Sequence, residues 1–279
     1  MDEDSWQLQL FRRSIKKKDK LRILSEEIKI DENDIVLDLG CAQGLLSYFL
    51  KQKGGCWIHA DLDFPNLKSS VPLLKRGLIQ TGPRKLPFKT GCFDKIISLD
   101  FLEHVDDDLH CLQEIKYLLK PKGELFLTVP HTGRFFLLHR LRPLFGIKPE
   151  DYGHIREGYS LKTLKQMLEE AGFRVEKHRH FSRLFSEFIE LLINAVYIKF
   201  LGQKESPGLR DGHIRPMSDQ EFREKGKAFQ LYSLLYPFIW LISRLDKILI
   251  FHKGYSLYLK ARKKDSSSHP PKEWKNEKK

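Results

Sequence analysis

The stretch Val36-Leu37-Asp38-Leu39-Gly40-Cys41-Ala42-Gln43-Gly44 decides the fold. Apolar residues surround a single acid, and a glycine-spaced turn follows them. Leucines and aromatic residues then recur at helical spacing over residues 45–49. This pattern predicts a buried strand, a tight loop and the start of a helix, an arrangement in which backbone can approach a nucleotide-like ligand closely.

A glycine-spaced loop alone does not distinguish dinucleotide-binding from adenosyl-binding folds. Asp38 favours the second, because a carboxylate at the mouth of the first strand repels a pyrophosphate and suits a ligand carrying an ammonium and a sulfonium. A dinucleotide fingerprint would place its third glycine at position 45, which is Leu45. Asp61 follows Gly40 by 21 residues and ends a predicted second strand. An acid there can accept hydrogen bonds from ribose hydroxyls.

A second signature begins at Leu86-Pro87-Phe88 and continues through Phe93–Val105. The apolar part of that run predicts a fourth parallel strand, which ends in a polar loop at the sheet edge where doubly wound folds bind ligands. The run LKPKGELFLTVP over residues 119–130 predicts a turn at 120–123 and a fifth strand at 124–129. With these motifs the chain resembles the class I S-adenosylmethionine-dependent methyltransferases, in particular the methyltransferase type 11 or ubiquinone-biosynthesis-like group. The resemblance covers about residues 30–181 and the last strand.

The resemblance implies an α/β, Rossmann-like, doubly wound sheet of seven strands with the last strand antiparallel. It also implies that S-adenosyl-L-methionine is the cofactor. The residues that would bind it are Asp38, Gly40, Cys41, Ala42, Gly44, Asp61, Leu62, Leu86, Asp100 and Phe101. Asp38 would reach the ammonium, Asp61 the ribose and Leu62 the adenine. The chain departs from the family at Ala42, which replaces a glycine, and at Gly82, which replaces an acid that bonds the adenine amino group. We therefore expect weaker cofactor binding.

Three histidines are candidates for the chemistry, although each can equally be structural. His104 follows the fourth strand directly, and a histidine near its ordinary pKa is a suitable general base for a hydroxyl acceptor. It is the predicted catalytic residue. His131 is expected in the wall of the site, and His154 and Arg156 in a lid over it.

The sequence divides into four parts. Residues 1–30 read as a helical lead-in; 31–181 with 255–262 form the methyltransferase core; 182–254 are an apolar helical insert; and 263–279 are a disordered basic tail. The insert carries two apolar runs, Phe185–Leu201 and Leu231–Ile242, and neither reaches the roughly 18–20 residues needed to cross a bilayer. Two interpretations stay open: a helical cap on the sheet, or a surface that enters the headgroup region of a membrane.

The charge and the cysteine content of the chain indicate which kinds of partner it can bind. The formal net charge is +12, with basic clusters near both ends of the chain. Such clusters fit an anionic membrane surface, whereas nucleic acid is not expected because no recognisable binding module is present. The four cysteines show no zinc-like spacing, so we predict no metal site. The absence of a basic-then-apolar leader favours a cytoplasmic protein, associated with the cytoplasmic face of a membrane if the insert binds lipid.

Three function classes follow from these patterns. The first is a methyltransferase acting on a small or lipid-like acceptor, through oxygen. The second is an RNA- or protein-directed methyltransferase, supported by the basic clusters. The third is a non-catalytic adenosyl-binding scaffold that retains the fold.

Overall fold

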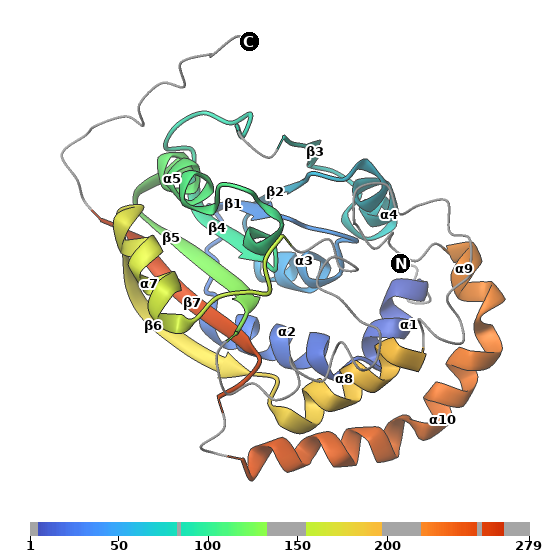
Figure 1. Ribbon diagram of the computed structural model, residues 1–279. Helices are drawn as coiled ribbons and strands as arrows, with labels where there is room; N and C mark the ends of the chain where they lie inside the picture. Colours follow the sequence, from blue (N-terminus) through green and yellow to red (C-terminus); the bar gives the residue numbers. More distant parts are fainter. Residues whose placement is uncertain (1–4, 83–84, 133–154, 197–218, 250–252, 265–279) are drawn as a thin grey trace, which may run out of the picture.

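The computed structural model describes residues 5–82, 85–132, 155–196, 219–249 and 253–264 (Figure 1). His154, residues 265–279 of the predicted tail and the end of the first apolar run of the insert lie outside the described residues. The sequence-based division into four parts therefore stays a prediction.

Seven strands form one sheet in the order β3-β2-β1-β4-β5-β7-β6. They are β1 (Ile35–Leu39), β2 (Cys56–Asp61), β3 (Leu78–Gln80), β4 (Phe93–Leu99), β5 (Leu119–Pro130), β6 (Phe173–Phe181) and β7 (Ser256–Lys263). Strands β1 to β5 pair in parallel, and β7 is antiparallel to both β5 and β6. The predicted fold class is confirmed.

Strand β5 begins five residues earlier than the sequence indicates. The predicted turn at 120–123 is an irregularity inside the strand, because the pairing with β4 shifts from Phe93 opposite Leu119 to Lys95 opposite Glu124. Lys122 takes a positive φ of 63° there. The backbone therefore turns without leaving the sheet, as bulges do.

Helices cover both faces of the sheet because successive strand residues point to opposite sides. Leu37 and Leu39 face the cluster formed with α5 (Asp108–Leu118) and α7 (Leu161–Glu170). Val36 faces the other cluster, formed with α2 (Ile15–Glu27) and α3 (Leu45–Leu50). Helix α3 continues as a 3-10 turn, η1 (Lys51–Lys53), and α4 (Phe64–Leu74) lies beside β2 and β3.

The lead-in is two helices rather than one. Helix α1 (Trp6–Arg12) ends before Ser14, whose side chain accepts a hydrogen bond from the Lys17 backbone and caps the start of α2. Helix α1 packs against α3 and α4, while α2 packs against the sheet through Ile23, Leu24 and Ile28.

The insert forms α8 (Leu184–Val196), α9 (Asp219–Glu224), α10 (Gly226–Ser243) and a 3-10 turn, η6 (Arg244–Lys247). Helix α8 contacts α2, and α10 contacts α8 and forms the outermost layer of the molecule (Figure 1). No helix within the described ranges is both long and apolar enough to span a bilayer.

Candidate cofactor and acceptor site

The loop after β1 is held in a left-handed conformation next to Phe101. Gly40, Ala42 and Gly44 all have positive φ, of 83°, 47° and 74°. The backbone N–H groups of Gly40 and Cys41 donate to the Ala60 carbonyl oxygen at 2.8 and 3.0 Å, which ties the loop to β2. A Cβ on Gly40 would lie 2.7 Å from the Phe101 ring. Only glycine fits there, and the loop backbone is drawn close to the end of β4 as a result.

Asp38 is buried in β1 and its carboxylate is oriented by two side chains. Ser47 of α3 donates a hydrogen bond to it, and the His59 Nδ1 atom lies 3.3 Å from the same oxygen. His59 sits opposite Asp38 in the β1–β2 register, so both side chains point to the same face. Neither His59 nor Ser47 is among the site residues predicted from the sequence. Side chains alternate between the two faces of a strand, so His59 and Asp61 point to the same face of β2. That alternation is a signal in the sequence that could have placed His59 near Asp38.

Asp61 joins the end of β2 to the glycine loop. Its carboxylate accepts hydrogen bonds from the backbone N–H of Ala42 at 2.7 Å and of Asp63 at 2.9 Å, and from the Asn66 amide at 3.3 Å. Burial raises the pKa of the Asp61 carboxyl, and the two backbone donors act against that rise. Donors from the glycine loop on one side and from residues 63 and 66 on the other fix the Asp61 carboxylate in place. Its position therefore does not depend on a bound ligand.

The residues at this edge fit an adenosyl donor. Two buried carboxylates stand on adjacent strands, joined by the left-handed loop, and an ammonium and ribose hydroxyls are the groups that such oxygens accept. Leu86 is buried and Leu62 packs half-buried against the same core, as apolar neighbours for a purine. Position 82 is open, since a Cβ on Gly82 would meet nothing within 4 Å. Cys41 is buried, and burial raises the pKa of its thiol, so the sulfur stays protonated.

Asp100, directly after β4, lies in a cluster of charges that the sequence did not reveal. It has a φ of +50°, accepts a hydrogen bond from the Thr128 hydroxyl at 2.9 Å and forms an ion pair with Lys20 of α2. Burial works to raise the pKa of the Asp100 carboxyl, but the Lys20 ammonium outweighs it, so the pKa lies below its ordinary value. One turn earlier on α2, Lys16 pairs with Glu187 of α8 at 3.0 Å.

Glu103 is the exception at this edge. It lies in the 3-10 turn η2 (Leu102–His104), is fully buried, and neither carboxylate oxygen has a hydrogen-bond partner among the described residues. Burial raises its pKa well above the ordinary value, and the nearby Asp100 charge raises it further. Glu103 therefore keeps its proton to a higher pH than an exposed glutamate does.

The predicted histidines lie in different surroundings. His104 is half-buried at the end of η2, on the same edge as Asp100, and its backbone N–H donates to Phe101. His131 is buried, and its Nδ1 atom lies 2.8 Å from the Gly254 carbonyl oxygen on the β7 side. Burial lowers the pKa of His131, which favours the neutral ring.

Arg156 ties its segment to the loop that follows His104. Its guanidinium pairs with Asp108 and donates to the carbonyl oxygens of Val105 and Asp106, each at 2.9 Å, and to the Tyr159 hydroxyl at 2.8 Å. This network anchors the chain before α7 against the start of α5. Whether residue 154 joins it lies outside the described residues.

Known proteins share this architecture. The fold resembles the crystal structure of a methyltransferase of Bacillus halodurans with a TM-score of 0.56 at 17% identity, over 88% of this chain and 99% of that one. Among curated relatives, a ubiquinone biosynthesis O-methyltransferase of Haemophilus ducreyi is 35% identical over 114 residues, 37% of this chain and 48% of its own length. The human mitochondrial arginine-hydroxylase NDUFAF5 is 32% identical over 149 residues, 50% of this chain and 41% of its own.

The chain thus spans about half the length of the curated relatives it matches. A family model described as a methyltransferase domain matches residues 8–178, which include the glycine loop, Asp61 and the whole of η2. On this match over more than half of its length, the chain belongs to the methyltransferase domain family.

Proposed function

We propose that this protein transfers a methyl group from S-adenosyl-L-methionine to a hydroxyl oxygen of a small or lipid-like acceptor. The observation that supports it best is the pair Asp38 and Asp61, fixed at one end of adjacent strands with a left-handed backbone loop between them. Two carboxylates in that arrangement favour a positively charged adenosyl ligand and disfavour a phosphate-bearing one. When bound, that cofactor supplies an electrophilic methyl group on its sulfonium.

The protein's own part is to bind, orient and exclude water. Asp38 would accept from the cofactor ammonium, Asp61 would accept from the ribose hydroxyls, and Phe101 and Leu62 would shield the site. Holding donor and acceptor in line in a dry site contributes on the order of 7–11 kcal/mol to the lowering of the barrier. Cofactor positioning therefore accounts for most of the proposed acceleration.

On the acceptor side, His104 is the proposed general base. It follows Asp100 and Phe101 on the turn at the end of β4, next to where the reacting methyl would lie. An imidazole that takes the hydroxyl proton as the new O–C bond forms would contribute about 10²–10⁴ in rate. The relatives' description as O-methyltransferases of ubiquinone biosynthesis supports oxygen as the acceptor atom and an apolar acceptor.

Cofactor binding is tested by titrating S-adenosylhomocysteine into the wild-type protein and two variants in a calorimeter. Asp61→Asn keeps the shape of the side chain but removes its charge, so we expect affinity to fall about 30-fold, or roughly 2 kcal/mol. Asp63→Asn is the matched control. The Asp63 side chain makes no capping hydrogen bond to α4, and the hydrogen bond from residue 63 to the Asp61 carboxylate comes from its backbone N–H, which the substitution keeps. Equal affinities for wild type and Asp61→Asn would contradict the assignment.

The reaction is tested by following labelled methyl transfer to phenols and catechols that carry tails of increasing length. We expect turnover to improve with tail length, and His104→Ala to lower kcat at least 100-fold without changing S-adenosylhomocysteine affinity. Unchanged turnover in His104→Ala would make His104 a structural residue. Absence of transfer to every hydroxyl acceptor, with cofactor binding intact, would remove the O-methylation proposal.

One finding favours a second candidate, a protein-directed reaction. The relative NDUFAF5 is named for the modification of arginine rather than for methyl transfer to a small molecule. Incubation of arginine-containing peptides with the protein and methyl-labelled cofactor tests a protein-directed methyl transfer, which would label the peptide; a hydroxylation would add oxygen and leave the peptide without the methyl label.

A further inference from the structure

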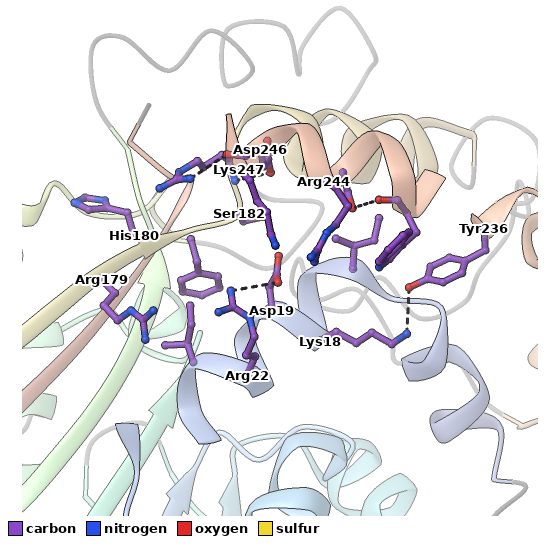
Figure 2. A pocket seen from close by; sticks show the side chains of 16 residues that line it. Lys18, Asp19, Arg22, Arg179, His180, Ser182, Tyr236, Arg244, Asp246 and Lys247 are labelled. Atoms are coloured by element: carbon purple, nitrogen blue, oxygen red, sulfur yellow. Dashed lines mark hydrogen bonds and ion pairs between the residues drawn. The ribbon is translucent and has the colours of Figure 1, made fainter. Parts of the chain in front are cut away.

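A cavity lies against α2, away from the residues of the predicted cofactor site. It has a volume of about 470 Å³ and is lined by α2, the end of β6, the two residues before α8, α10 and η6 (Figure 2). None of its lining residues belongs to the predicted cofactor site. Lys16 and Lys20 face the cluster at Asp100, whereas Lys18, Asp19 and Arg22 of the same helix line this cavity. Helix α2 is thus a wall shared by two separate sites.

Basic side chains outnumber acidic ones in the lining of the cavity, and two of them are paired: Arg179 with Glu26 and Glu27, and Arg22 with Asp19 and Glu26. Six basic side chains line it: Lys18, Arg22, Arg179, Arg183, Arg244 and Lys247. Its two carboxylates are Asp19, which pairs with Arg22 at 3.5 Å, and Asp246. The Asp246 carboxylate accepts the backbone N–H groups of Arg183, Phe185 and Ser186 at 3.1, 2.7 and 3.1 Å. Asp246 therefore orients the start of α8, and with Asp19 it leaves the six basic side chains of the cavity in excess.

Aromatic rings, rather than acids, hold several of these cations. Lys18 donates to the Tyr236 hydroxyl at 3.2 Å and lies 5.1 Å from the centre of that ring. The Arg244 guanidinium lies 5.1 Å from the centre of the Trp240 ring. Within the described part of the chain, Lys18, Arg244 and Lys247 form no ion pair with a carboxylate. Cations arranged in this way keep their charge available to an anion from outside.

An exposed apolar stripe runs along α10 and η6 and ends at Ile248, directly after η6. It consists of Leu231, Leu234, Phe238, Leu241, Leu245 and Ile248, spaced by three or four residues and each between 40% and 73% exposed. That spacing puts them on one face of a helix. Trp240 lines the cavity and is itself 44% exposed, so one aromatic side chain of α10 belongs both to the cavity and to the surface of the helix.

From this juxtaposition we infer that the cavity binds the phosphate headgroup of an anionic membrane lipid while the α10 stripe enters the apolar part of the bilayer surface. A helix that lies in the interface buries its apolar face at the boundary between headgroups and acyl chains, and nearby lysines and arginines attract the anionic lipid. Charge complementarity selects a lipid phosphate over a second protein chain. The inference concerns binding alone and does not depend on the proposed methyl transfer.

The test is flotation of the full chain with vesicles, without cofactor. Vesicles of phosphatidylcholine alone are compared with vesicles that also contain phosphatidylglycerol. We expect binding to require phosphatidylglycerol and to weaken as salt is raised. The double variant Arg244→Gln with Lys247→Gln should weaken binding to the anionic vesicles by about tenfold or more, because each basic residue near the surface contributes to the attraction.

A matched control removes the same charge elsewhere. Lys162→Gln with Arg174→Gln changes two exposed basic residues on α7 and at the start of β6, and should bind the anionic vesicles as the wild type does. Leu234→Ser with Phe238→Ser should abolish flotation, with an unchanged melting temperature because both side chains are exposed.

Three outcomes would overturn the inference. Equal losses in the cavity and control variants would make the effect one of net charge alone. Binding of inorganic phosphate in the cavity without flotation would assign it to a soluble phosphate ligand. Self-association that Leu234→Ser with Phe238→Ser abolishes, without flotation of the wild type, would assign the stripe to a contact between two copies of the chain.

Discussion

The sheet edge at Asp38 and Asp61 and the cavity against α2 carry charges of opposite sign. At the edge, the carboxylates of Asp38 and Asp61 are oriented beforehand by hydrogen bonds from the fold. In the cavity, Lys18 and Arg244 lie against aromatic rings, and Asp246, one of the two acids in the lining, accepts hydrogen bonds from backbone. At the edge, the fold orients carboxylates that suit a small cationic ligand. In the cavity, it leaves ammonium and guanidinium groups that suit an anion from outside the chain.

The largest expected effect is a loss of stability caused by a substitution in the glycine loop at the sheet edge. Gly40→Ala forces a side chain into a left-handed backbone, which costs about 1–2 kcal/mol, and against Phe101, where overpacking costs about 1–3 kcal/mol more. We expect the free energy of unfolding in urea to fall by about 3 kcal/mol. Gly82→Ala is the control: its Cβ meets nothing, and its effect should stay within about 0.5 kcal/mol. A loss below 1 kcal/mol for Gly40→Ala would show that the loop relaxes freely.

The next effect tests whether Asp246 belongs to the fold rather than to the cavity's charge balance. Asp246→Ala removes the acceptor of three backbone N–H groups at the start of α8 and should lower the free energy of unfolding by about 1–2 kcal/mol. Asp246→Asn keeps an acceptor oxygen and should lose much less. If both variants were more stable than the wild type, Asp246 would instead be a strained acid in the cavity.

The smallest effect concerns Glu103, the one edge carboxyl described here without a hydrogen-bond partner. Its pKa is raised in the folded chain, so the folded state holds the proton more tightly than the unfolded state does. Stability is then lost as the pH rises above the ordinary value of 4.5. Glu103→Gln removes that loss. We expect the variant to exceed the wild type by about 1 kcal/mol at pH 8 and to match it near pH 4, as measured by urea unfolding.

An equal difference between Glu103→Gln and the wild type at both pH values would contradict this account. It would mean that packing, and not ionisation, separates the two side chains. Glu103 would then resemble Asp38 and Asp61, whose carboxylates the fold stabilises by hydrogen bonds.

Much of the edge follows from local pattern. Residues 36–44 predict a strand, a turn and a helix start because apolar spacing and glycine positions are local properties, and β1 and α3 are found there. Ser14 divides the predicted lead-in into α1 and α2 because its side chain caps the second helix, a signal present in the sequence but easily missed inside a run of lysines. The early start of β5 depends on pairing with β4, which no local pattern contains.

The partners of the functional residues are the part that sequence reasoning missed. Lys20 and Asp100 are 80 residues apart, and Lys16 and Glu187 are 171 apart. The cavity needs α2, β6 and α10 together, although the sequence does show the lysines, the arginines and the aromatic insert separately.

By itself the sequence determined the sheet class and the position of the glycine turn after β1, because strand alternation, glycine turns and helix caps act over a few neighbours. Only the tertiary structure decided which charges meet. Ion pairs and cavities depend on side chains that folding brings together from distant segments, and the chain order does not encode those distances directly. Asp246 shows this most clearly: the sequence presents an acid between basic residues, and the fold makes it the cap of a helix that begins 62 residues earlier at Leu184.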